Sequence, residues 1–105
     1  MTVVTRFVFK SGDRDALDGV IDDIVETSRR KGAQLKGPHR DPPIDHQVSL
    51  YRHFGEEPEA VEAAASTWTY TVFQRRVALH GHDDLAREFL ERDYPDSIQV
   101  EAEVG

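Results

Sequence analysis

The sequence predicts an α+β fold of the ferredoxin-like, split βαβ type, in which a four-stranded antiparallel sheet carries two helices on one face. Segments rich in β-branched and aromatic residues alternate with two amphipathic segments of helical period, in the order strand, helix, strand, strand, helix, strand. The chain has 105 residues, which is enough for one hydrophobic core, so we interpret residues 1–105 as a single domain. This fold hosts many activities and assigns none by itself.

The first half of the chain predicts a strand, a helix and a short second strand. Residues 3–10 have the β-branched and aromatic composition of a strand, and residues 15–31 repeat apolar side chains at helical spacing. Acidic residues near the start of this helix and basic residues at its end, followed by Gly32, agree with the helix dipole and a glycine stop. Residues 33–37 predict a short strand, and Asp41-Pro42-Pro43 predicts an irregular connection, because proline has no backbone N–H.

The second half predicts a hairpin, a helix and a last strand. Residues 47–54 alternate as a half-buried strand, and residues 67–80 form the longest strand candidate. Between them, residues 56–66 are polar and alanine-rich, so both a short helix and a mobile insertion remain open. A second helix follows Gly81, with Leu85, Phe89 and Leu90 expected on one side. Residues 98–104 alternate as a strand with one wet face.

Composition narrows the classes of function. Cysteine is absent, which excludes disulfides and thiolate chemistry, and no apolar run approaches the roughly 20 residues that span a bilayer. We therefore expect a cytoplasmic protein without a membrane partner. The net charge of −7 disfavours general nucleic-acid binding. An acidic chain with more arginine than lysine suits a salt-rich, haloarchaeal cytoplasm, where screening is strong; the alternative is an ordinary acidic soluble protein.

The chain has no sequence pattern typical of catalysis. It contains no glycine-rich phosphate loop, no GxSxG and no HExxH, so we expect no enzyme activity, no cofactor and no small-molecule substrate. His80, His82 and Asp83 could present metal ligands, but a turn that begins a helix is the preferred interpretation, and we expect no metal. Trp68 and Tyr70 share a strand face, where packing within the hairpin is preferred over stacking on RNA bases.

Basic residues gather at two places. Lys36 follows the basic end of the first helix, and Arg75 and Arg76 are adjacent on the longest strand. Neighbouring strand residues face opposite ways, so both arginines can be exposed only where the strand leaves the body of the domain. We therefore expect the arginine pair to lie on a protruding hairpin that contacts a partner.

The stretch VIDDIVETSRRKGAQLKGPHRDPP, from Val20 to Pro43, resembles ribosomal protein S-ten, the tenth protein of the small subunit. It matches the family's first helix, second strand and proline-containing loop, and KGAQLKGP is its most specific part. TWTYTVFQRRVALHG, DDLAREFL and DSIQVEAEVG match the later strand with its basic element, the second helix and the last strand.

The resemblance implies a non-catalytic protein of translation, with a compact body and a long hairpin that contacts ribosomal RNA and neighbouring ribosomal proteins. It also implies a transcription-factor partner, as in bacterial members. The implied contact residues are Lys36, Gly37, Pro38, His39, Arg40, Gln74, Arg75 and Arg76. The family's basic run after the loop is missing, since Ile44-Asp45-His46-Gln47 stands there. A stand-alone protein-interaction paralogue, acting in transcription or translation control outside the ribosome, is therefore the alternative.

Overall fold

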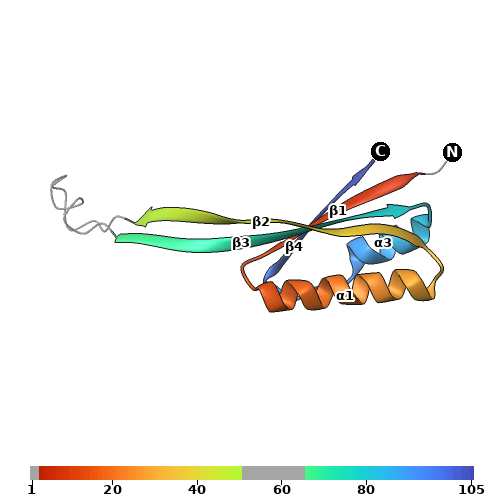
Figure 1. Cartoon of the computed structure of the whole chain (residues 1–105), viewed down its shortest axis with the longest axis horizontal. Helices are drawn as coiled ribbons and strands as arrows, with labels where there is room; N and C mark the ends of the chain where they lie inside the picture. Colours follow the sequence, from red (N-terminus) through yellow and green to blue (C-terminus); the bar gives the residue numbers. More distant parts are fainter. Residues whose placement is uncertain (1–2, 51–65) are drawn as a thin grey trace.

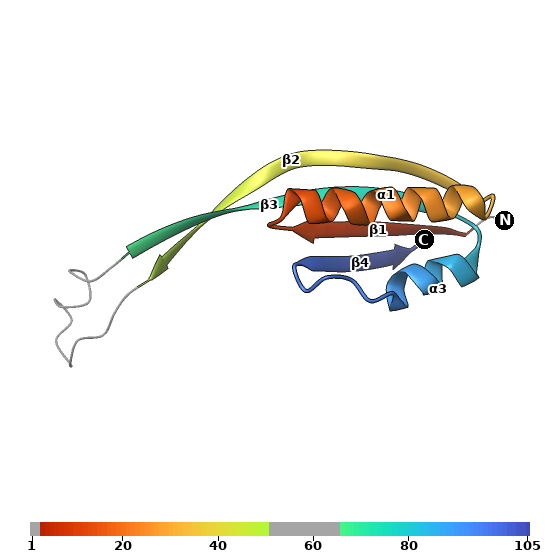
Figure 2. The ribbon, with the colours of Figure 1, turned by 90° about the horizontal axis from the view of Figure 1, so that it is seen from below.

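The computed structural model describes residues 3–50 and 66–105, which form a sheet covered by helices on one face (Figures 1 and 2). The elements are β1 (Val4–Ser11), α1 (Arg14–Arg30), β2 (Gln34–Leu50), β3 (Ser66–His80), α3 (Asp83–Glu91) and β4 (Ile98–Val104). The sheet order is β2-β3-β1-β4, and each neighbouring pair is antiparallel. The predicted ferredoxin-like arrangement is confirmed.

The core lies between the helices and the helix-facing side of the sheet. Its buried apolar side chains are Phe7, Phe9, Leu17, Ile21, Ile24, Val77, Leu79, Leu85, Ala86, Phe89 and Ile98. Helix α1 begins after Asp13, whose Oδ1 accepts a hydrogen bond from the Ala16 N–H at 3.1 Å, and it ends before Gly32, which has a positive φ of 68°. The predicted helix and its apolar face are therefore confirmed, with bounds one residue earlier.

Strand β2 differs from its prediction. We expected a short strand ending at Gly37 and an irregular connection through the prolines, but β2 runs without a break from Gln34 to Leu50. The register shifts between Lys36 and His39 and between Asp41 and Ile44, so one extra residue is inserted at each place. The prolines lie at these two irregularities of an edge strand, where their missing N–H groups cost no ladder bond.

Gly37 is needed at the first of these irregularities. Its φ is +105°, and a Cβ built on it would lie 2.8 Å from the carbonyl oxygen of Arg76. Only glycine adopts this conformation without strain and lets the two backbones approach so closely. Gly37 therefore sets how β2 lies against β3.

The β2–β3 hairpin extends beyond the rest of the sheet, as predicted. Strand β1 pairs with β3 only from Phe73 to His80, whereas β2 follows β3 as far as Ser66. Residues 44–50 and 66–72 thus pair only with each other, and we call them the arm; Figures 1 and 2 show them reaching past α1. The expected strand residues 51–54 and most of the segment 56–66 lie outside the described residues.

Two side-chain predictions in the last elements are wrong. Leu90 is 50% exposed and Ala86 is buried instead, because Leu90 lies about 140° around the helix axis from Leu85. The alternation of residues 98–104 predicts that Val104 shares the buried face of Ile98, but Val104 is 66% exposed. The twist of the sheet carries this end of the edge strand away from both helices (Figure 1).

The two leucines of α3 allow a matched test of this packing. Leu85→Ala is expected to lower the free energy of unfolding by about 2–5 kcal/mol, because it leaves a cavity under the helix. Leu90→Ala, in the same helix, is expected to change it by only about 0.5 kcal/mol. Urea unfolding measures both, and equal losses would contradict the assignment of the buried face.

Candidate docking surface on the helix-free face

The side of the sheet away from the helices, which we call the helix-free face, is open and charged. Opposed residues of antiparallel strands share a face, so the register assigns its members. Strand β1 contributes Arg6, Val8 and Lys10, which alternate with the buried Thr5, Phe7 and Phe9. Their register partners on β3 are Ala78, Arg76 and Gln74, and those on β4 are Glu103, Glu101 and Gln99.

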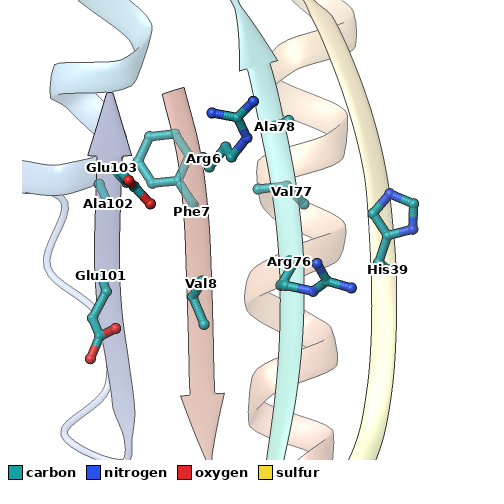
Figure 3. Close-up of a pocket in the computed structure, with 10 residues that line it drawn as sticks. All are labelled: Arg6, Phe7, Val8, His39, Arg76, Val77, Ala78, Glu101, Ala102 and Glu103. Carbon is teal, nitrogen blue, oxygen red and sulfur yellow. The ribbon is translucent and has the colours of Figure 1, made fainter. Parts of the chain in front are cut away.

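A shallow hollow of about 460 Å³ crosses the middle of this face. Figure 3 shows the side chains of Arg6, Arg76 and His39 on β1, β3 and β2, with Glu101 and Glu103 on β4 and α1 behind the sheet. The basic side chains of the hollow therefore lie on β1, β3 and β2 and two carboxylates lie on β4, while Asp41 adds a third carboxylate on β2. An open, charged surface of this kind suits contact with a macromolecule better than enclosure of a small substrate.

Asp41 organises the base of the hairpin. Its carboxylate accepts hydrogen bonds from Arg76 Nε at 2.9 and 3.1 Å and from Gln74 Nε2. The Arg76 bond, and after it the Gln74 bond, stabilise the ionised form, so the pKa of Asp41 lies below its usual value of 3.8. Asp41 lies between the two irregularities of β2, so these bonds hold that segment of the strand against β3.

Arg75 lies on the opposite side of the sheet, where it is buried against α1. It is only 5% exposed, its Nε donates to Asp18 Oδ1 of α1 at 3.1 Å, and its Nη1 donates to the Gln74 carbonyl oxygen at 3.0 Å. Arg75 and Arg76 pair in register with Phe9 and Val8 of β1. The expectation that the arginine pair lies on the protruding part of the hairpin is thus wrong: both belong to the four-stranded body, and one of them is buried.

The remaining predicted contact residues lie along the β2 edge, except for Gln74 on β3. Lys36, Pro38, His39 and Arg40 are exposed, and Gly37 forms the close backbone approach described above. Gln74 is half-buried and bonded to Asp41. We call the exposed basic residues Lys36, His39, Arg40 and Arg76 the basic edge; Arg40, opposite Arg75, lies on the helix side of this edge, and the other three lie on its helix-free side. The sequence analysis did not identify Arg6 or Asp41 as residues of this surface. The alternation of Arg6 with Thr5 and Phe7 could have indicated that Arg6 faces away from the core, whereas no sequence pattern indicated the contact of Asp41 with Arg76.

The turn before α3 contains the residues that the sequence singled out as possible metal ligands. His82 is the residue before the helix, with a φ of 55° and without a side-chain capping bond, while Asp83 and Asp84 occupy the first turn. The two aspartates therefore favour the helix dipole rather than cap the helix. Across residues 3–50 and 66–105, no group of three or more potential metal-ligating side chains is found.

The helices of the described residues are also too short or too polar to cross a membrane.

Fold and surface together define a class: a two-layer ferredoxin-like domain with an open, charged sheet face and a hairpin extended into an arm. Residues 6–103 match the family model of ribosomal protein S10p/S20e. The chain belongs to this family, which confirms the resemblance found in its sequence. No curated protein matches the chain.

The contact between Asp41 and Arg76 makes a prediction for titration. The lowered pKa means that the ionised carboxylate and its bonds persist above the pKa of the unfolded chain and are lost as the pH falls through the folded value. In NMR titration, the Asp41 carboxyl carbon is expected to have its midpoint below 3.8, and Arg76→Ala is expected to raise it. Arg87→Ala, in the exposed part of α3, is the control. An unchanged midpoint in Arg76→Ala would contradict the geometry.

The two adjacent arginines are expected to differ in their effect on stability. Arg75→Ala removes a buried charge from its partner Asp18, so the free energy of unfolding should fall by about 2–4 kcal/mol. Arg76→Ala removes an exposed side chain and should have a much smaller effect. Urea unfolding of both variants compares them directly. A loss as large for Arg76→Ala would show that both arginines are structural.

Proposed function

We propose that this chain is a non-catalytic component of the small ribosomal subunit, which contacts ribosomal RNA and neighbouring proteins in translation. The observation that carries this proposal is the family match, which covers residues 6–103 and thus nearly the whole chain. The sheet also supports the proposal, because the helices cover only one of its faces and the helix-free face is available for contact with a macromolecule.

We assign the RNA contact to the basic edge. Lys36, His39 and Arg40 are exposed on the outermost strand, where a phosphate backbone can approach without passing over the carboxylates of β4. The side chain of Arg76 is 53% exposed, and its Nε donates a hydrogen bond to Asp41. Its two Nη groups have no hydrogen-bond partner among the described residues and can donate to a phosphate. Asp41 thus orients the guanidinium and, as its ion-pair partner, lowers the net charge at this place on the surface.

The net charge of −7 is compatible with such a contact. At about 1 M salt the Debye length is about 3 Å, so charges beyond the contact itself no longer repel the RNA. We propose that the chain works in a salt-rich cytoplasm, where the local basic edge decides binding. At low salt, the distant carboxylates are expected to oppose association.

A stand-alone interaction protein of the same family is the second candidate. The missing basic run after Pro43 and the pairing of Arg76 with Asp41 favour it, because both reduce the number of phosphate contacts. Sedimentation of a lysate at the native salt concentration separates the two candidates. Co-sedimentation of the chain with small subunits supports the ribosomal function, and its absence there favours the stand-alone protein.

Salt-dependent RNA binding tests the assigned surface. Arg40→Ala is expected to weaken binding of the full chain to purified small-subunit ribosomal RNA and to reduce the slope of log K against log salt by about 0.7–0.9, because one phosphate contact is lost. Filter binding over a range of KCl concentrations measures the slope. The matched control is Arg87→Ala, an arginine that is also exposed but lies in the helical layer, and its slope should equal that of the unchanged chain. Equal slopes for both variants would contradict the basic edge.

A further inference from the structure

Asp41 is an acidic residue that lies among the residues of the basic edge. It follows His39 and Arg40 directly in β2. Its register partner on β3 is Gln74, two residues before Arg76. Both oxygens of the Asp41 carboxylate lie within hydrogen-bond distance of one atom, Arg76 Nε, at 2.9 and 3.1 Å. An arginine has one N–H at Nε and four at its two Nη atoms, so Asp41 occupies the Nε side of the guanidinium and leaves the Nη end open.

The Asp41 carboxylate is fixed from two directions. Gln74 Nε2 donates to its Oδ2, and Arg76 Nε donates from the same strand. The backbone of Asp41 pairs with Gln74 and lies between the two irregularities of β2. These bonds keep the pKa of Asp41 below its usual value, so the carboxylate is ionised at neutral pH. The side chain of Asp41 is 23% exposed, against 53% for Arg76, so a ligand meets the arginine with a fixed anion beside it.

Asp41 also acts at a shorter distance than the other carboxylates of the helix-free face. Among the described residues, it is the only acidic side chain that forms an ion pair with a residue of the basic edge. Glu101 and Glu103 belong to β4, two strands from Arg76, which is roughly 10 Å at about 4.8 Å per strand. At about 1 M salt the Debye length is about 3 Å, so their charge is screened, whereas that of Asp41 is not.

We propose that Asp41 is a specificity-determining residue, a fixed anion that lets Arg76 bind an RNA phosphate end-on through its Nη groups and repels phosphates that approach from the Nε side. Specific binding sites combine attraction for the right partner with repulsion of wrong ones. A folded RNA that places a phosphate at the Nη end gains a bidentate contact. A flexible RNA, whose phosphates reach the edge in many orientations, loses those on the Nε side. This inference rests on the proposed function, because it takes RNA to be the ligand of the basic edge.

Binding to two different RNAs tests this role. Asp41→Asn removes the charge but keeps an oxygen that can accept from Arg76 Nε. Filter binding measures the dissociation constants of the full chain for purified small-subunit ribosomal RNA and for poly(U), a flexible single strand. We expect Asp41→Asn to tighten poly(U) binding about fivefold, which is the effect of one added phosphate contact at about 0.1 M salt, and to change binding of the ribosomal RNA by less than about twofold. The preference for ribosomal RNA should therefore fall.

Asp22→Asn is the matched control, because it changes the net charge equally at an exposed aspartate of α1, in the helical layer. It should change binding of either RNA by less than about twofold. In an Arg76→Ala background, Asp41→Asn should have no larger effect than Asp22→Asn, because Asp41 acts through Arg76. All variants are compared at one KCl concentration at which circular dichroism shows them folded. A full fivefold tightening without Arg76 would overturn the inference.

The failure of this inference is distinguishable from failure of the proposed function. If the unchanged chain prefers small-subunit ribosomal RNA and Asp41→Asn leaves that preference equal or raises it, Asp41 does not determine specificity and the proposed function survives. If the unchanged chain binds the ribosomal RNA no more tightly than poly(U), the proposed RNA contact fails and the inference falls with it.

Discussion

The antiparallel ladder between β2 and β3 is the interaction on which the body and the arm both depend. It runs from Gln34 opposite His80 to Leu50 opposite Ser66, while β1 supports only the second half of β3. Two one-residue irregularities in β2 each reverse which side its residues face, so the second restores the alternation that the first interrupts. Gly37 permits the first of them, because any side chain there would meet the Arg76 carbonyl. The ladder thereby continues through a proline-rich sequence and carries the arm beyond the helices.

The alternation of β3 places Arg75 on the helix side of the sheet and its neighbours Gln74 and Arg76 on the helix-free side. Arg75 lies on the helix side, is buried, and connects the sheet to Asp18 of α1. Gln74 and Arg76 lie on the helix-free side, where both bond to Asp41. A desolvated arginine is stabilising only while its partner remains, so Arg75 has a structural role, whereas Arg76 is exposed and available for the contact that we propose.

Charge and apolar surface lie at different places along the same hairpin. The basic edge is at the base of the hairpin, on the body, and the arm offers aromatic and hydroxyl groups without lysine or arginine in its described residues. This arrangement reconciles an acidic chain with membership of a ribosomal protein family. Under the proposed function, phosphates need only the local basic groups of the edge, because charges farther away are screened at high salt.

The sequence by itself determined the order of the elements, the core face of α1, the alternation of β3 and the family, because these depend on local periodicity and on motifs such as KGAQLKGP. It wrongly predicted that β2 ends at the prolines, because proline usually interrupts a strand. Here β2 is an edge strand and its prolines lie at the two irregularities, so the strand continues. Only the tertiary structure decided that Arg75 is buried, that Asp41 holds Arg76, and that Leu90 and Val104 face solvent. Each of these depends on which distant element lies opposite, and the spacing of residues along one strand or helix contains no information about that.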